Sequence, residues 1–318
     1  MQYNAIRSLA QLNWSQSTGW KVFRWVLWLA VVAYCVFRWQ TGFSEEVERH
    51  IHAIAQSSSL RGLLLAVLCL MPLNWYLETL RWRTLLKEQQ LETQVAWRGV
   101  WMGLVLGLWL PRLLGDYLGR VGELPSDKRK VGVAQAFLGQ ATLMSSTLAA
   151  GIFGVVLYVG GGLLVALVGV VLALFLIPFC VWLSLTYMPH RVKRYYPTAT
   201  KLTLSPRRFA QIQGLAHLRY GVFMFQYFLL LQLFLPELPP YIILGGITWV
   251  YLAKSITPFL HVFGDLGVRE LSALLFFDTW GVSAVTVMAP TLLLWALNVM
   301  VPAAFGGILW MKFRSKSS

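Results

Sequence analysis

The chain has 318 residues, of which 57% are hydrophobic, 14% aromatic and only 13% charged. Soluble domains carry about 25% charged residues, and a soluble fold has no room for repeated apolar runs close to the ~20 residues that span a bilayer. The composition therefore indicates a membrane protein and excludes fibrous, disordered and disulfide-rich classes.

The formal net charge of +14 reflects 27 Lys and Arg residues against 13 Asp and Glu residues. In membrane proteins this excess collects in cytoplasmic loops, where it meets anionic lipid headgroups. We therefore expect a membrane surface, and no nucleic acid, as the partner of these charges. Cys35, Cys69 and Cys180 lie singly in apolar runs without the spacing of a zinc site or a disulfide framework, so we expect no metal and no cofactor.

The first half of the chain predicts three membrane spans, at 21–39, 60–80 and 131–159. The acidic segment 44–50 belongs outside, whereas the basic residues at 81–87 and 128–130 belong to the cytoplasmic face. A segment between two cytoplasmic ends must enter and leave on the same side. We therefore predict a re-entrant hairpin at 97–124.

The second half predicts spans at 163–187, 214–235 and 284–310. The most basic segment, 190–219, is expected to be a cytoplasmic loop. Because the preceding and following spans fix both of its ends outside, 241–278 is predicted to be a second re-entrant hairpin, dipping from the opposite face. Both termini are then cytoplasmic in a multi-pass protein of the inner (cytoplasmic) membrane.

The two hairpins resemble each other in sequence. Each runs through proline, Gly-Asp, glycine, arginine and Glu-Leu, at 111–124 and at 258–271. The fold class predicted is therefore an all-α polytopic membrane protein with an inverted repeat, comprising about six full transmembrane helices and two re-entrant hairpins. Its membrane repeats are 1–162 and 163–318, and in such proteins interrupted helices at matching places mark the substrate site. The hairpin backbone depends on Pro111, Gly115, Pro258, Gly264 and Gly267.

Ionisable side chains stand beside the apolar arms of both hairpins, where a charge costs at least ~2.5 kcal/mol on insertion scales. We predict that they line a substrate cavity in which arginine forks bind phosphate or carboxylate. These substrate-binding candidates are Arg112, Asp116, Arg120, Lys254, Asp265, Arg269 and Glu270. The alternative is structural: Asp116 with Arg120, and Asp265 with Arg269, have the i,i+4 spacing of helical ion pairs, and Lys254 has the reach to snorkel to the surface.

Two further features have structural explanations. Gly99, Gly103 and Gly107 recur every four residues, which favours close helix packing over substrate contact. Glu78, near the end of the second span, is expected to pair with Arg81 or Arg83. No catalytic motif is found, so an enzyme is not the primary hypothesis.

The chain resembles the transmembrane, flippase-like region of lysylphosphatidylglycerol synthases, whose members also occur as stand-alone membrane proteins. The resemblance rests on 80–86, on 110–120 and on Pro258 to Glu270 followed by Gly281-Val282-Ser283. It implies translocation of phospholipids, anionic or aminoacylated, between leaflets, with a homo-oligomer or a separate lipid-modifying enzyme as a further partner. The alternatives are a membrane-embedded transferase, or an accessory protein, acting on lipid-linked envelope precursors.

The predicted topology is testable by labelling from either side of the membrane. Single cysteines replacing Ser126 and Thr279, in a background lacking the three native cysteines, should react with an impermeant maleimide from opposite faces. Ser126 should label from the cytoplasm and Thr279 from outside. Labelling of both positions from one face would contradict the two opposed hairpins.

Overall fold

A computed structural model describes residues 57–110, 112–187, 205–257 and 267–314, together with isolated positions between 26 and 56. At 109, 112–113 and 308–314 only the backbone is described. Within these ranges the chain is helical throughout and forms no strand. The predicted all-α class is therefore confirmed for the described part of the chain.

The helices of the first half follow one another with short connections. They are α4 (Ser58–Leu85), the 3-10 turn η2 (Lys87–Gln89), α5 (Thr93–Trp109), α6 (Arg112–Gly122) and α7 (Arg129–Tyr158). Ser57 caps α4, because its side chain accepts a hydrogen bond from the Leu60 amide at 3.4 Å. The turn between α7 and α8 passes through Gly160, whose φ of +77° favours glycine.

The second half begins with α8 (Leu163–Thr186) and α10 (Pro206–Phe234). It continues through α11 (Pro240–Ile256), α12 (Val268–Asp278), α13 (Ala284–Trp295), the π-helical turn η5 (Ala296–Met300) and α14 (Val301–Arg314). The π turn ends two residues before Pro302, which lacks the amide hydrogen that a regular α-helix requires.

Among the helices that the structure describes, four are long and apolar enough to cross a membrane: α4, α7, α8 and the continuous run from Ala284 to Gly307. They coincide with the predicted spans 60–80, 131–159, 163–187 and 284–310. Only 17% of the apolar window of α8 is buried against the rest of the protein, so most of this apolar helix is left uncovered. The predicted span 21–39 lies largely outside the described residues.

Helix α10 begins earlier than the sequence predicted. We expected a loop up to Arg219 and a span at 214–235, whereas the helix starts at Pro206. The Ser205 side chain caps it by accepting from the Arg208 amide, and proline occupies the first turn, where its missing donor costs nothing. Arg219 is consequently in the middle of a helix and buried, and not in a cytoplasmic loop; segment 190–204 lies outside the described residues.

Helices α5 and α6 form an antiparallel pair in which glycine meets glycine. A β-carbon on Gly119 would approach the Gly103 nitrogen to 2.2 Å, and one on Gly115 would approach the Gly107 α-carbon to 2.4 Å. Gly99 faces the Arg120 backbone in the same row. The glycines at 99, 103 and 107 therefore serve close packing, because they let α6 lie tightly against α5.

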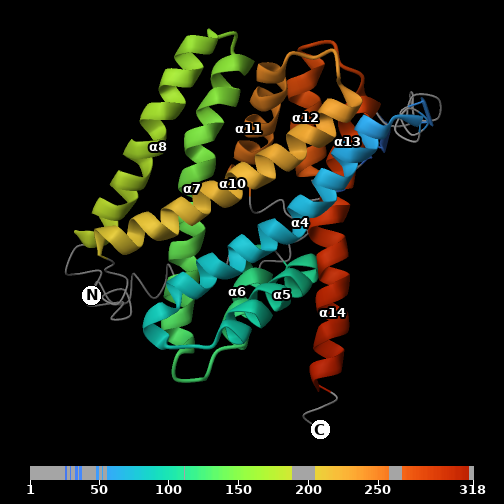
Figure 1. Cartoon of the computed structure of the whole chain (residues 1–318). Helices are drawn as coiled ribbons and strands as arrows, with labels where there is room; N and C mark the ends of the chain where they lie inside the picture. The colour runs from blue at the N-terminus through green and yellow to red at the C-terminus, as the bar shows by residue number, and fades with distance from the viewer. Residues whose placement is uncertain are drawn as a thin grey trace.

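Helices α11 and α12 form a second antiparallel pair, closed mainly by aromatic side chains. Phe277 and Phe276 pack over Gly246 and Gly245, and the Trp249 indole donates to the Ser272 carbonyl at 3.1 Å. Figure 1 shows the α5–α6 pair and the α11–α12 pair at opposite ends of the molecule.

The middle of the molecule is formed by α4 and α10, which run side by side in opposite directions (Figure 1). Polar side chains join them along their length: Gln226 donates to the Val67 carbonyl at 2.9 Å, and Arg208 donates to the Thr84 and Leu85 carbonyls at the end of α4. Around this pair, α7 packs on α8 and α11, and α14 packs on α5. Asn298 in the π turn donates to Gln226 at 2.8 Å and ties η5 to α10.

The apolar core has two main parts. One surrounds Trp82, Val100 and Leu138 where α4, α5 and α7 meet the start of α10. The other, larger part surrounds the rest of α10 together with α11 and α12, and includes Tyr227 and Phe276. Polar residues occupy the boundary between these two parts.

The glycine contacts predict that adding one methyl group to α6 destabilises the protein at a packed position and not at an open one. Gly119→Ala should destabilise the protein by ~1–3 kcal/mol, because the new β-carbon meets backbone that has no freedom to move aside. Gly122→Ala, on the same helix with nothing within 4 Å, should leave stability unchanged or slightly raised. Thermal unfolding of the purified protein in detergent compares the two, and equal midpoints would contradict the close packing of α5 and α6.

Candidate functional site

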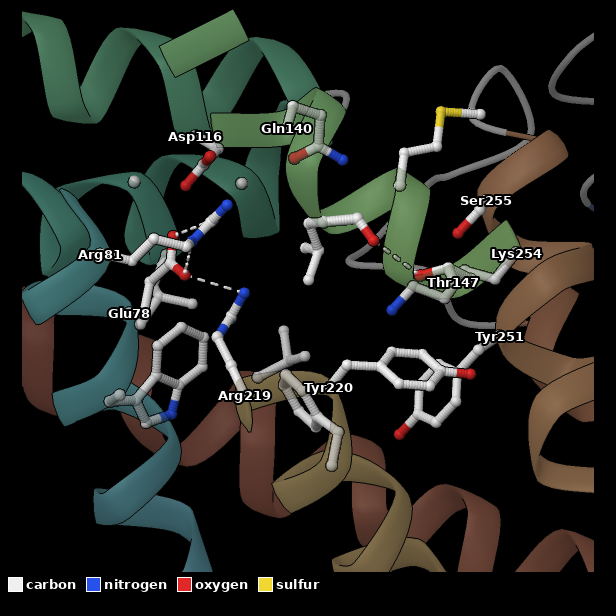
Figure 2. Close-up of a pocket in the computed structure, with 18 of the residues that line it drawn as sticks. Glu78, Arg81, Asp116, Gln140, Thr147, Arg219, Tyr220, Tyr251, Lys254 and Ser255 are labelled. Atoms are coloured by element: carbon white, nitrogen blue, oxygen red, sulfur yellow. Dashed lines mark hydrogen bonds and ion pairs between the residues drawn. The ribbon is translucent and has the colours of Figure 1, made fainter. Parts of the chain in front are cut away.

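A cavity of about 230 Å³ lies at the boundary of the two core parts (Figure 2). Its walls come from six helices, α4, α5, α6, α7, α10 and α11, and from Val299 of the π turn. Glu78, Asp116 and three arginines gather on one side, whereas aromatic residues such as Tyr220 and Tyr251, together with Lys254, line much of the remainder. The wall of the cavity is therefore partly charged and partly apolar.

Glu78 of α4 is the centre of the charged side and is fully buried, with 0% of its surface exposed. Arg81, one turn further along α4, donates to both of its carboxylate oxygens, at 2.8 and 3.0 Å. Arg120 of α6 reaches Oε1 at 2.6 Å, and Arg219 of α10 reaches Oε2 at 3.0 Å. One carboxylate thus joins three arginines from three helices, and each charge depends on the others because isolated buried ions are too costly.

Each arginine is also held by a second polar partner. Arg120 Nε donates to Asp116 Oδ1 at 2.8 Å, the helical ion pair that its spacing predicted. Arg219 Nε donates to Asn74 Oδ1 at 3.0 Å. Arg81 donates to the Gly139 carbonyl and, at 3.3 Å, to Thr142 Oγ1 of α7. These contacts fix the guanidinium planes of the three arginines relative to Glu78.

Aromatic rings cover the faces of two guanidinium groups. The Arg120 guanidinium lies 5.5 Å from the centre of the Trp82 ring, and that of Arg219 lies 5.5 Å from Trp75 and 5.1 Å from Phe223. Arginine is suited to such stacking because its planar ion is weakly hydrated. The rings shield the planes and leave the edges of the ions for hydrogen bonding.

Buried hydroxyl and amide groups extend the polar region along α7 and α10. Gln213 accepts from Ser145 at 3.0 Å and donates to Ser146 and to the Thr142 carbonyl, each at 3.2 Å. Its amide also lies 3.2 Å from the His217 ring nitrogen. These contacts hold α10 against α7 and fix the direction from which Arg219 enters the cluster.

Lys254 and Ser255 of α11 line the cavity on the side opposite Glu78 and Arg81 (Figure 2). The Lys254 ammonium lies 5.8 Å from the centre of the Tyr251 ring, and Tyr251 packs edge-on against Tyr220. Lys254 belongs to this aromatic wall and forms no part of the contacts around Glu78. A ligand in the cavity would thus have arginines on one side and an ammonium on the other.

The structure brings together three of the residues predicted from sequence, Asp116, Arg120 and Lys254, at one cavity. Two others lie apart from it. Glu270 accepts from the Gly267 amide at 2.7 Å and caps α12, and Arg269 is buried beside it, with Nε 3.5 Å from Glu270 Oε1. Gly267 has a φ of +96°, which explains the glycine there.

The remaining predicted positions divide into two kinds. Gly115 packs against α5 and supports the hairpin, as described above. Outside the described residues lie Pro111, Pro258, Gly264 and Asp265. For Arg112, only the backbone is described.

Sequence reasoning did not assign Glu78, Arg81 or Arg219 to the substrate site. The expected pairing of Glu78 with Arg81 is confirmed, and the structure adds Arg120 and Arg219, distant in the chain, while Arg83 takes no part in the cluster. Arg219 was assigned to a basic loop. The available signal was the apolar sequence that surrounds Glu78 and follows Arg219, since an ion in such a segment needs a partner from another helix.

Within the described ranges, no three His, Cys, Asp or Glu side chains gather in a way that could hold a metal ion. Comparisons with protein-family models, with curated proteins and with solved structures find no match to this chain. The resemblance to the lysylphosphatidylglycerol synthase membrane region accordingly stays a prediction, and the site is interpreted from its own chemistry.

Removing the central carboxylate should be much more damaging than removing an exposed one. Glu78→Gln leaves three buried arginines with too little negative charge, so we expect a loss of ~3–5 kcal/mol in unfolding free energy. The matched control is Glu123→Gln, whose ion pair with Arg98 is partly exposed and 3.7 Å long, and which should cost less than ~1 kcal/mol. Similar unfolding midpoints for the two variants in detergent would contradict a central role for Glu78.

Proposed function

We propose that this protein is a flippase-like lipid transporter that moves a phospholipid, or another headgroup-bearing lipid, between membrane leaflets. The observation that carries the proposal is the charged cavity at the meeting point of α4, α6, α10 and α11. Buried charge is expensive among apolar helices and marks substrate pathways in membrane proteins. A polar cavity with aromatic walls suits a molecule that is itself part polar and part apolar.

The packing of the helices supports an inverted repeat of 1–162 and 163–318. In that arrangement α4 corresponds to α10, α5 to α11, α6 to α12, and α7 to the run from α13 to α14. The contact of α4 with α10 then maps onto itself, and the contact of α7 with α11 maps onto that of α14 with α5. A two-fold axis in the membrane plane produces this pattern, and transporters built this way carry their substrate at the interface of the repeats.

The membrane placement follows from this symmetry. We infer six full spans, contributed by 21–39, α4, α7, α8, α10 and the run from α13 to α14. The pairs α5–α6 and α11–α12 are the two re-entrant hairpins, entering from opposite faces of the inner membrane, with both termini cytoplasmic. Helical hairpins are tolerated at membrane depth where protein or a polar cavity satisfies the backbone of the turn.

During transport, the lipid headgroup would bind in the cavity. The ordered arginines replace part of the hydration shell of a phosphate with charge-assisted hydrogen bonds, while the acyl chains stay in lipid along the exposed face of the protein. Because Glu78 joins helices of both repeats, a movement of one repeat against the other would reach the headgroup through this cluster. The same chemistry is what the resemblance to the lysylphosphatidylglycerol synthase membrane region implies.

A bulky side chain in the cavity should block this transport. Ser255→Trp fills the space from α11 without touching the contacts of Glu78, and we expect it to slow leaflet exchange of fluorescent phospholipids in proteoliposomes at least ~10-fold. Ser184→Trp, on the exposed face of α8, is the matched control and should exchange lipid at the parental rate.

Monodispersity of each variant establishes that it is folded. Parental exchange by a folded Ser255→Trp protein would contradict transport through this cavity. Absence of exchange in the parental protein, together with turnover of a lipid-linked precursor, would favour the membrane-embedded transferase instead.

A further inference from the structure

A second pair of charged side chains is buried at the start of α12, apart from the cluster around Glu78. Arg269 is 3% exposed and Glu270 is 1% exposed. Further along the same helix, Phe276 and Phe277 belong to the larger part of the apolar core. Among the described residues, Nε and Nη2 of Arg269 have no hydrogen-bond partner, and Glu270 Oε1 has none either. The Arg269 Nε lies 3.5 Å from that oxygen without donating to it.

The two unpartnered donors lie on the same edge of the guanidinium group. Nε and Nη2 together form the fork that binds a carboxylate or a phosphate through two parallel hydrogen bonds. Arg81 presents this same fork to Glu78, with Nε donating to Oε2 at 3.0 Å and Nη2 donating to Oε1 at 2.8 Å. In Arg269 no described residue accepts from the fork. Buried donors without a partner are rare in folded proteins, and each needs an explanation.

Arg269 lies behind the aromatic wall of the cavity. Tyr220 and Tyr251 line the cavity on the side away from the arginine cluster (Figure 2). Beyond them, Tyr227 packs edge-on against Tyr251 with the ring centres 6.2 Å apart. The Tyr227 hydroxyl is in turn close enough to Arg269 and Glu270 to interact electrostatically with both. Neither of these charged residues lines the cavity itself, so the tyrosines stand between the cavity and the open fork.

We propose that Arg269 is a second binding site for the phosphate of the transported lipid, beyond Tyr220 and Tyr251 as seen from the cavity. This inference rests on the proposed lipid transport and adds a second headgroup site to it. A phosphate that passes the tyrosine rings would accept from Nε and Nη2 together. Glu270 is held by the Gly267 amide at 2.7 Å, so it stays beside the fork without filling it. Its carboxylate weakens the attraction, which suits a site that must also release its ligand.

Chemical modification tests this site one arginine at a time. The full chain in nonionic detergent is treated with phenylglyoxal, which reacts with accessible guanidinium groups, and peptide mass spectrometry follows each arginine. Reaction is compared without lipid, with dioctanoyl phosphatidylglycerol, with dioctanoylglycerol, which lacks the phosphate, and with glycerol phosphate, which lacks the chains. Arg98, whose side chain is 43% exposed, is the control that should react in every sample. Arg81, enclosed by Glu78 and α7, is the control that should not react.

We expect Arg269 to react in the native chain, because a site on the path of the lipid must open. Saturating dioctanoyl phosphatidylglycerol should slow this reaction at least ~10-fold, since bound ligand protects the protein in proportion to its concentration over its dissociation constant. Dioctanoylglycerol should leave the rate unchanged. An Arg269 that reacts only after denaturation, or that both lipids protect equally, would overturn the proposal.

A double substitution separates phosphate binding from a structural role of the pair. Arg269→Gln with Glu270→Gln removes both charges, while the new amide oxygen at 270 still accepts from the Gly267 amide. We expect an unfolding midpoint equal to or above the parental one, because a poorly paired buried ion pair adds little stability, together with slowed leaflet exchange of fluorescent phospholipids. The control, Arg98→Gln with Glu123→Gln, removes a partly exposed pair and should keep the parental exchange. A lowered midpoint, or parental exchange by the folded double variant, would refute the second site.

The two proposals fail separately. If phosphatidylglycerol protects Arg269 but the parental chain exchanges no lipid, the phosphate site stands and transport is wrong. If glycerol phosphate protects Arg269 as well as phosphatidylglycerol does, the site takes a phosphate from solution, and again lipid transport is the proposal that is contradicted. If exchange proceeds and phosphatidylglycerol leaves Arg269 unprotected, the second site is wrong and transport stands.

Discussion

The structure depends on the need to neutralise a carboxylate that is buried among apolar helices. Glu78 is fully enclosed, and α6 and α10 each bring an arginine to it, in addition to Arg81 of its own helix. Removing the Glu78 carboxylate would leave buried arginines without their shared counter-charge in a medium of low dielectric constant. The cluster therefore sets the relative position of three helices that apolar packing alone would allow to slide.

The position of the α5–α6 pair is part of the same arrangement. Arg120 reaches Glu78 because α6 lies against α5 at glycine-to-glycine distance, which places the Arg120 backbone beside Gly99. Larger residues in that row would move α6 outward and withdraw its arginine from the carboxylate. The glycines thus act on the site indirectly, by setting how close a charged helix approaches.

Sequence patterns predicted the helices better than their contacts. Apolar runs near twenty residues located α4, α7, α8 and the run from α13 to α14 because length and hydropathy are local properties. The i,i+4 spacing of Asp116 and Arg120 predicted their ion pair for the same reason. The link from Glu78 to Arg219 has no such signal, since it joins residues far apart in the chain, and clustered positive charge made the start of α10 resemble a loop.

The proposed transport requires this cavity to open to each side of the membrane in turn. Met144 lines the cavity and is 37% exposed, so a single cysteine there, in a chain lacking Cys35, Cys69 and Cys180, reports access directly. The measurement is its modification by an impermeant thiol reagent, applied to spheroplasts and separately to inverted vesicles. The account predicts modification in both preparations, slowed by phosphatidylglycerol. Modification from one face only, with full reaction after denaturation, would contradict alternating access.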